Sequence, residues 1–373
     1  MEALILSCGT GGGHNSAGKA VAEELKRRNH NAVMLNPYNL RSKKLAGKIN
    51  NVYIALAQKA PRFFGAVYGA GQLYRKLPFR SPVYFINRLM VSALGEYLAE
   101  NHFDIIIMTH LFPAEIITNM RNSGIAVPKT MFIGTDYTCI PFTEETDCDV
   151  YVIPSAELSD DYTKKGIAKE KLCSLGIPVL GRFSESENRD EVRQKLGLDL
   201  NKKYILVSGG SMGGGQIKKA IKTLSSVIAD SENTELITIC GNNKKLFDKL
   251  KNADYPKVTV LGFTENMAEY MKGADLFVTK PGGLSSTEAA VSKVPILHTA
   301  AIPGCETRNA EFFSKNGMSR LCKASKRELS DAIKIINDEK ACLDMTENQR
   351  RKINSNAAAD ICDLAERLTK CEN

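Results

Sequence analysis

The fold of this chain is constrained most by a pattern that occurs once in each half: an apolar strand, a glycine-rich turn and an amphipathic helix. In the first half, the apolar run 3–6 precedes the turn 9–13 and a helical pattern over 15–28. In the second half, the run 204–207 precedes the turn 209–215 and another helical pattern. A glycine-rich turn lets the backbone approach a ligand, and the N-terminus of the following helix favours negative charge. Both turns therefore predict sites for an anionic ligand.

Further short apolar runs extend this pattern through the chain, at 105–108, 130–133, 150–153, 236–240, 258–261, 276–279 and 295–298. Helical patterns alternate with many of them, which is typical of parallel sheets built from βαβ units. A polar stretch over 181–203 separates the two halves, and the residues from Lys326 onward are predicted to be helical. We therefore predict an α/β fold with two Rossmann-like domains, 1–181 and 182–373, that face each other across a cleft. Whether the C-terminal helices return to the first domain stays open.

The composition excludes several classes of protein. Hydrophobic residues make up 43% and charged residues 25% of the chain, as in soluble globular proteins and unlike disordered ones. No run approaches the roughly 18 consecutive apolar residues of a membrane-spanning helix, and the N-terminus shows no secretory signal. The ten cysteines form no C-x-x-C pair, so we expect reduced thiols in a cytoplasmic protein rather than a zinc ribbon or a disulfide framework.

One segment supplies the basic excess behind the net charge of +8. Between Leu25 and Gly95 the chain has thirteen Lys and Arg residues and no Asp or Glu, and ten of the thirteen lie between Arg41 and Arg88. Eight aromatic residues are interleaved with them: Tyr53, Phe63, Phe64, Tyr68, Tyr74, Phe79, Tyr84 and Phe85. This combination suits an anionic membrane surface, which attracts the charges and accepts the rings into its headgroup layer. Single-stranded nucleic acid, or a solvated face over an aromatic core, would also account for it.

The first glycine-rich turn, with the sequence GTGGGH, ends at His14. A lone histidine is usually structural, but one placed where a strand gives way to a helix can act as a general base. Residues 13–19 resemble a nucleotide-binding P-loop, yet Ala20 stands where the magnesium-binding hydroxyl is required. We therefore reject nucleotide hydrolysis as the function.

Three elements of the second half also have the character of ligand-binding loops. The turn 209–215 offers backbone N–H groups and the Ser211 hydroxyl to a diphosphate. After the run 276–279, a Pro-Gly-Gly turn precedes a helix, and Glu288 within the first turns of that helix can accept hydrogen bonds from a ribose diol. Pairing of this carboxylate with the helix N-terminus is the simpler alternative. The third element, 302–310, is a polar loop before a further helix.

Asp147 and Asp149 have the carboxylate spacing of a metal–diphosphate site. They directly precede the apolar run 150–153, so we interpret them as the start of a strand. No cluster of His, Cys, Asp and Glu has the spacing of metal ligands, and we predict no metal in the site.

Together, the motifs resemble those of the monogalactosyldiacylglycerol synthase and processive diacylglycerol glucosyltransferase family. The resemblance rests on GTGGGH at 9–14, TDY at 135–137, GGSMG at 209–213, GFTENM at 262–267 and TKPGGLSSTEA at 279–289. Members of this family are inverting glycosyltransferases with the two-domain GT-B fold. The resemblance implies that the C-terminal domain binds a UDP-sugar and that the N-terminal domain binds a lipid acceptor at the membrane.

The resemblance also implies roles for individual residues. His14 and Asp136 would activate the acceptor hydroxyl, and Gly11, Gly12 and Gly13 would form an acceptor or phosphate loop. The implied donor-binding residues are Gly210, Ser211, Met212, Phe263, Gly282, Gly283, Glu288, Glu306 and Asn309. Of these, the phenylalanine would lie against uracil and the first glutamate would hold the ribose. This chain has a cysteine at position 305, where family members usually have a glutamine that touches the hexose.

The basic segment would then dock the acceptor domain on a bilayer. The implied membrane-binding residues are Lys43, Lys44, Arg62, Phe63, Phe64, Arg75, Lys76 and Arg80. The expected partners are a UDP-hexose, diacylglycerol or a related lipid and an anionic membrane surface, with no nucleic acid. The UDP-sugar is a substrate, and no cofactor is predicted. We expect a cytoplasmic protein that associates peripherally with the inner face of the cell membrane.

Other functions fit the same fold. A non-catalytic UDP-sugar sensor would keep Glu288 and the glycine-rich turns. A lipid II-type GlcNAc transferase is related in mechanism, although the segments 265–267 and 280–283 look more like the glycolipid group. An NDP-sugar epimerase would need no lipid surface, which the acid-free segment disfavours.

Overall fold

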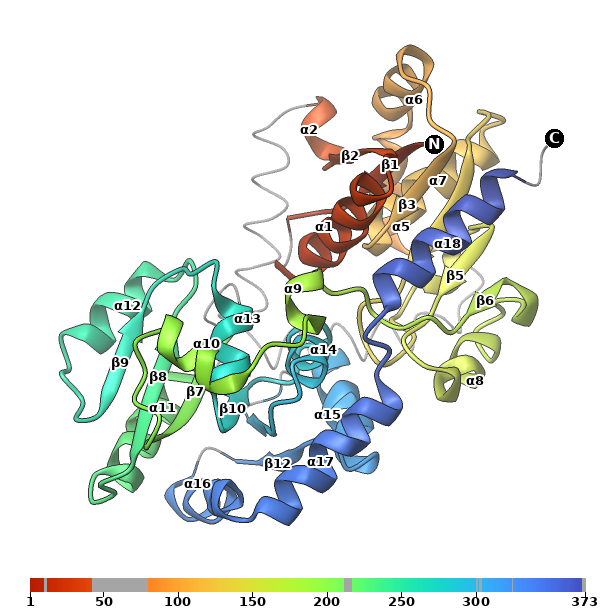
Figure 1. Ribbon diagram of the computed structural model, residues 1–373. Helices are drawn as coiled ribbons and strands as arrows, with labels where there is room; N and C mark the ends of the chain where they lie inside the picture. Colours follow the sequence, from red (N-terminus) through yellow and green to blue (C-terminus); the bar gives the residue numbers. More distant parts are fainter. Residues whose placement is uncertain are drawn as a thin grey trace. The chain divides into compact units, whose positions relative to one another are not determined.

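The computed structural model describes residues 1–9, 12–41, 80–210, 217–299, 301, 304–323 and 325–370. These residues form two compact units (Figure 1). Unit 1 contains Met1–Leu180, Pro303–Cys305 and Asn356–Asn373, and unit 2 contains Gly181–Ile302 and Glu306–Ser355. Each unit has its own parallel sheet, so the expected two-domain α/β fold is confirmed.

Unit 1 is built on a parallel sheet of six strands. In spatial order these are β2 (Asn31–Leu35), β1 (Glu2–Leu6), β3 (Ile105–Met108), β4 (Lys129–Ile133), β5 (Val150–Val152) and β6 (Leu172–Cys173). The three central strands are almost wholly buried, because helices cover both faces of a parallel sheet. Strand order reverses at β1, whose neighbours are β2 and β3. The carboxyl ends of β1 and β3 are therefore the expected place for a ligand.

Seven α-helices belong to the described part of unit 1. They are α1 (Gly12–Arg27), α2 (Tyr38–Arg41), α5 (Pro82–Arg88), α6 (Val91–Glu100), α7 (Leu111–Asn122), α8 (Ser159–Thr163) and α18 (Ala357–Lys370). Three short 3-10 helices, η1 (Thr143–Glu145), η2 (Ala156–Leu158) and η3 (Lys169–Lys171), lie between them.

The last helix of the chain, α18, belongs to unit 1 rather than to unit 2. Its buried residues Ile361 and Ala365 pack with Leu25 of α1 in one hydrophobic cluster. Arg28 ties the two helices together, because its guanidinium pairs with Glu366 at 3.1 Å and donates to the Ala359 carbonyl at 3.0 Å. The second domain therefore ends before α18, at Ser355.

Unit 2 repeats the architecture with a second parallel sheet of six strands. In spatial order these are β12 (Arg320–Cys322), β11 (Ile296–Thr299), β10 (Leu276–Thr279), β7 (Lys203–Ser208), β8 (Thr234–Ile239) and β9 (Val258–Leu261). The first strand of the unit, β7, lies in the interior of the sheet between β8 and β10. The order therefore reverses at β7, which predicts a ligand site beyond the carboxyl ends of β7 and β10.

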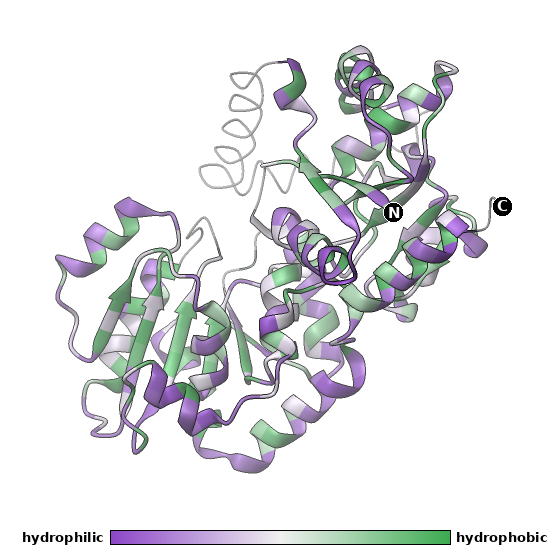
Figure 2. Ribbon diagram, turned by 45° about the horizontal axis from the view of Figure 1, so that its top comes forward, coloured by the Kyte–Doolittle hydropathy of each residue, from purple (hydrophilic) through white to green (hydrophobic). Residues whose placement is uncertain are grey.

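The described helices of unit 2 fill its two outer layers. They are α9 (Gly181–Ser184), α10 (Arg189–Lys195), α11 (Ile217–Ile228), α12 (Lys244–Lys251), α13 (Met267–Gly273), α14 (Gly283–Val291), α15 (Cys305–Lys315), α16 (Lys326–Ile333), η4 (Lys334–Asn337) and α17 (Glu339–Lys352). Figure 2 shows the strands of both sheets as largely hydrophobic and many helix residues as hydrophilic. Within the described part of the chain, none of the helices combines the length and the apolar character needed to cross a bilayer.

Candidate functional site

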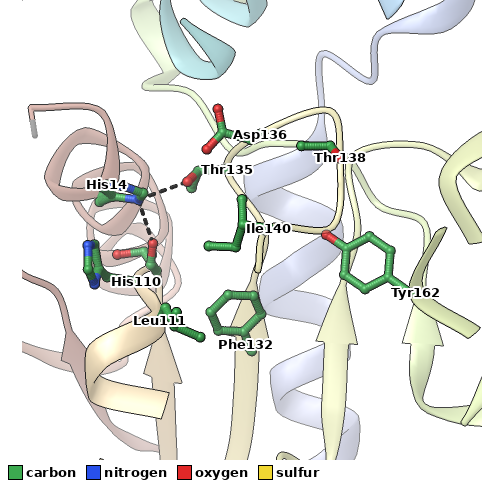
Figure 3. A pocket seen from close by; sticks show the side chains of 11 residues that line it. His14, His110, Leu111, Phe132, Thr135, Asp136, Thr138, Ile140 and Tyr162 are labelled. Atoms are coloured by element: carbon green, nitrogen blue, oxygen red, sulfur yellow. Dashed lines mark hydrogen bonds between the residues drawn. The ribbon is translucent and has the colours of Figure 1, made fainter. Parts of the chain in front are cut away.

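A pocket in unit 1 lies at the carboxyl ends of β1, β3 and β4 (Figure 3). Its lining residues are His14, Thr109, His110, Leu111, Phe132, Gly134, Thr135, Asp136, Thr138, Ile140 and Tyr162. They come from the first turn of α1, the residues between β3 and α7 with the first residue of α7, β4 with the loop after it, and α8. The predicted pair His14 and Asp136 is therefore brought into one pocket, at the point where the strand order reverses.

The hydrogen bonds of His14 determine which of its ring nitrogens can act as a base. Its Nδ1 lies 2.9 Å from the carbonyl oxygen of Thr109 and 2.8 Å from Oγ1 of Thr135. A carbonyl oxygen can only accept, so Nδ1 carries the proton and donates to both oxygens. The lone pair of the neutral ring is then on Nε2, which is the nitrogen able to accept a proton.

Burial and charge act in opposite directions on His14. Desolvation lowers the pKa of His14 below the ordinary value of a histidine, while the Asp136 carboxylate and the hydrogen bond to Thr109 oppose this shift. The imidazole is therefore neutral at neutral pH, as a general base requires. Figure 3 shows Thr135 and Asp136 on one loop, with the threonine hydroxyl bonded to the histidine.

His110 is a residue of this pocket that sequence reasoning missed. Its ring centroid lies 4.6 Å from that of His14, and the two rings meet edge to face at 79°. Its Nδ1 accepts a hydrogen bond from the backbone N–H of Phe112 at 3.1 Å, so the side chain caps the N-terminus of α7. Burial and the neighbouring His14 hold the pKa of His110 well below the usual range, so this ring stays neutral. Its position directly after a buried strand was the available signal.

The glycine turn of unit 1 is described only in part. Gly12 and Gly13 form the first residues of α1, immediately before His14, so the expected helix begins within the turn. Gly11 lies outside the described residues. The role of these glycines in binding an acceptor or a phosphate stays a prediction.

Most of the predicted membrane-binding residues also lie outside the described residues, namely Lys43, Lys44, Arg62, Phe63, Phe64, Arg75 and Lys76. Arg80 is described, and it is engaged with the protein itself. Its guanidinium donates to the Glu145 carbonyl oxygen at 2.6 Å and lies 4.8 Å from the centre of the Tyr84 ring.

In unit 2, the glycine turn after β7 includes a position whose backbone conformation requires glycine. Gly210 has a φ of +75°, a conformation that side chains rarely adopt. Ser211 and Met212, the predicted diphosphate contacts that follow it, lie outside the described residues.

The second glycine turn of unit 2 connects β10 to α14. Gly282 caps this helix, and a Cβ atom added there would meet no heavy atom within 4 Å. Open space beside the helix N-terminus, followed by Gly283 as the first helical residue, leaves room for an anion to approach the backbone.

Glu288 is the sixth residue of α14, so it lies beyond the first turn of the helix. It is half-buried, and its carboxyl forms no hydrogen bond with the described residues. Burial raises the pKa of Glu288 to about 8, against the opposing effect of Arg182. A partly buried carboxyl group that forms no hydrogen bond with the described residues can accept hydrogen bonds from a ligand.

Phe263 follows β9, and it is 66% exposed. An aromatic side chain this exposed contributes little to the core, so it is available to stack on a planar ligand. Its contact with uracil stays a prediction.

Glu306 and Asn309, predicted to contact the donor sugar, have partners within the protein. Glu306 is 7% exposed, and its carboxylate forms an ion pair with the ammonium group of Lys280. Asn309 is fully buried, and its side-chain amide donates to the Pro281 carbonyl oxygen at 3.0 Å. Both residues therefore connect the first part of α15 to the turn after β10.

Asp147 and Asp149 lie directly before β5, as the apolar run after them predicted. Oδ2 of Asp149 accepts hydrogen bonds from the backbone N–H of Thr130 at 2.7 Å and from Arg121 at 2.6 Å. This carboxylate therefore connects the start of β4 to Arg121 of α7. Over the described ranges, no three His, Cys, Asp or Glu residues are grouped so that they could hold a metal ion.

Two known families match the chain, one in each half. Residues 14–179 match the family Monogalactosyldiacylglycerol (MGDG) synthase, and residues 204–366 match the family Glycosyltransferase family 28 C-terminal domain. The first match covers the pocket with its two histidines, and the second covers both glycine turns of unit 2.

Individual relatives extend over most of the chain. A processive diacylglycerol beta-glucosyltransferase of Bacillus licheniformis is 26% identical over 363 residues, which are 96% of this chain and 92% of the relative. The chloroplastic monogalactosyldiacylglycerol synthase of Spinacia oleracea is 28% identical over 337 residues, which are 87% of this chain and 64% of the relative.

Solved structures show the same fold. MurG of Acinetobacter baumannii has a TM-score of 0.64 and 16% sequence identity, and the match covers 98% of this chain and 99% of that protein. A putative UDP-N-acetylglucosamine 2-epimerase of Listeria monocytogenes has a TM-score of 0.65 and 11% sequence identity, and the match covers 100% of this chain and 97% of that protein. These structures show the fold alone. The two family matches, together with relatives that match nearly the whole chain, show that the chain belongs to the family of monogalactosyldiacylglycerol synthases and processive diacylglycerol glucosyltransferases.

Proposed function

We propose that this protein transfers a hexose from a UDP-sugar to diacylglycerol with inversion at the sugar carbon, and so makes a membrane glycolipid. The relatives named as diacylglycerol glycosyltransferases, which match nearly the whole chain, support this reaction. The observation that carries the chemistry is the hydrogen bonding of His14, which leaves Nε2 of a neutral imidazole to take up a proton.

The reaction follows from that placement. Nε2 of His14 removes the proton from the acceptor hydroxyl as its oxygen attacks the anomeric carbon of the sugar. A carbon–oxygen bond to the acceptor forms, and the bond between the sugar and the diphosphate breaks. The electron pair of that bond leaves with UDP, and the acceptor proton stays on the imidazole until water removes it.

The donor would bind in unit 2, where two glycine turns follow adjacent strands. Gly210 and Gly282 allow the backbone to approach the diphosphate, whose charge the N-terminus of α14 stabilises. Glu288 would hold the ribose, and Phe263 would stack on the uracil.

Product analysis tests this function. The protein is incubated with diacylglycerol vesicles and UDP-glucose, UDP-galactose or UDP-GlcNAc, each labelled in the sugar, and the lipids are identified by mass spectrometry. We expect a glycosylated diacylglycerol with release of UDP. Binding of UDP without transfer would instead indicate a sugar-nucleotide sensor. Transfer of GlcNAc only to a lipid diphosphate would indicate a lipid II-type enzyme.

We further propose that unit 1 binds the inner face of the cell membrane peripherally. The thirteen basic residues between Leu25 and Gly95, without any acidic residue, support this. The helix α5 lies in the same segment, and its outward face is apolar. Phe85, Ile86 and Leu89 are 54%, 55% and 63% exposed, whereas Tyr84 is buried. Exposed apolar side chains on a basic segment suit insertion between anionic headgroups.

Neutralising the basic segment should weaken membrane binding. We expect a variant with Lys43, Lys44, Arg75 and Lys76 replaced by Gln to sediment less with anionic vesicles, most clearly at low salt, because each charge contributes about 1 kcal/mol near such a surface. The control replaces four lysines of α12 with Gln: Lys244, Lys245, Lys249 and Lys251. If both variants lose binding equally, or neither does, the basic segment is not the membrane-binding element.

A further inference from the structure

The two glycine turns of unit 2 start from neighbouring strands. β7 and β10 pair in parallel, and Ser208 lies opposite Thr279 at the ends of the two strands. The residues that follow, including Gly210 and Lys280, therefore emerge side by side at the point where the strand order of the sheet reverses.

The side chain of Lys280 extends from one turn toward the other. A Cβ atom added to Gly210 would lie 3.6 Å from Cε of this lysine. The ammonium group of Lys280 forms an ion pair with the carboxylate of Glu306 in α15. The side chain of this glutamate is 9% exposed. The lysine side chain itself is only 20% exposed. A cation is thus held in a fixed position between the two turns.

This ion pair has a physical cost that requires a compensating interaction. Removing an ammonium group from water is unfavourable, and the carboxylate partner offsets the loss. In return, a charge that is already partly desolvated interacts more strongly with a second anion than one in open water. The structure therefore places the Lys280 ammonium group beside the two glycine turns. Without it, only backbone groups would face an anion bound there.

We propose that Lys280 binds the diphosphate of the UDP-sugar and stabilises the negative charge that forms on UDP as the sugar departs, with Glu306 as its positioning residue. This inference rests on the proposed function, because it assumes a UDP-sugar donor at the two glycine turns. It gives Glu306 a different task from the sugar contact that the sequence predicted. It also accounts for the burial of that carboxylate against the lysine.

Titration with ligands of increasing charge tests the lysine. Calorimetry measures the dissociation constants of uridine, UMP and UDP for the wild type, Lys280→Gln, Lys280→Arg and Lys315→Gln, the last being an exposed lysine at the end of α15. We expect Lys280→Gln to weaken UDP binding roughly 10- to 100-fold, as for loss of a charge-assisted hydrogen bond, while uridine binding stays unchanged. Lys280→Arg should retain much of the UDP affinity, and Lys315→Gln should match the wild type. Unchanged uridine binding also verifies that the variant is folded.

Glu306→Gln tests the positioning role. If the carboxylate orients the lysine, its removal shifts the affinities for UDP and UDP-hexose by the same factor and lowers kcat, because the ammonium group loses its fixed direction. A change confined to UDP-hexose would assign Glu306 to the sugar and overturn the positioning role.

The two proposals fail in different ways. If the wild type binds no UDP and transfers no sugar, the proposed function is wrong. If the wild type binds UDP and transfers hexose, and Lys280→Gln binds UDP as tightly and transfers as fast, only the inference about the lysine is overturned.

Discussion

Replacing His14 with Ala should leave UDP binding intact and reduce hexose transfer by roughly 10²- to 10⁴-fold, the usual contribution of a positioned general base. The turns proposed to bind the donor belong to unit 2, whereas His14 lies in unit 1, so the substitution removes the proposed base without touching them. Single-turnover rates with preformed diacylglycerol vesicles measure the chemical step directly. His102→Ala is a suitable control, because that imidazole is 83% exposed and lies outside the pocket.

The pH dependence gives an independent reading of the same residue. A protonated imidazole cannot accept the hydroxyl proton, so activity should be lost as the pH falls through the pKa of His14. Burial lowers the pKa of His14, so this loss should occur below the pH at which an ordinary histidine titrates. The Asp136 carboxylate opposes the shift, so Asp136→Asn should move the acid limb to still lower pH.

Asp136 is the competing candidate for the base, and the same variants separate the two. If Asp136→Asn abolishes transfer while His14→Ala retains near wild-type rates, the carboxylate is the base and the histidine assignment is wrong. If the histidine is the base, Asp136→Asn retains activity at neutral pH and differs mainly in its pH profile.

The interior of both sheets could be predicted from sequence because of how parallel strands are buried. The apolar runs at 105–108 and 276–279 coincide with β3 and β10, since strands covered on both faces leave a continuous hydrophobic signal. The edge strands β2 and β12 gave no such signal. Each is partly exposed and includes polar or charged residues, such as Asn31 and Arg320, so a search for apolar runs passes over them.

The candidate site could be predicted where function requires a special residue type in one short motif. The turn before His14 and the left-handed Gly210 are examples, because glycine at such positions is itself the signal. His110 was missed because a position after a buried strand is by itself a weak signal, and only the pairing of β1 with β3 brings it to His14. The same reason applies to Lys280 and Glu306, which only the return of the chain through β11 and into α15 brings together.

Replacing Glu288 with Ala should weaken UDP binding roughly 10- to 100-fold, as expected when ribose hydroxyls lose hydrogen bonds to a charged group. The carboxyl is half-buried in α14 and forms no hydrogen bond with the described residues, so truncation breaks few contacts of the protein itself. Calorimetric titration with UDP and with uridine measures the effect, and both ligands should be affected equally because they share the ribose. Glu311→Gln, an exposed acidic residue of α15, is the control.

The pH dependence of uridine binding tests whether Glu288 accepts these hydrogen bonds as a carboxylate. Burial raises the pKa of Glu288 to about 8 in the unliganded protein, so the group is largely protonated at pH 7. Hydrogen bonds from the ribose favour the ionised form, so binding should release a proton and the affinity should rise as the pH increases through about 8. Uridine carries no phosphate that titrates, so below the pH at which the uracil ring itself ionises the slope reports the carboxyl, and Glu288→Gln should abolish it. An equal slope in that variant, or an unchanged dissociation constant for Glu288→Ala, would remove Glu288 from the ribose site.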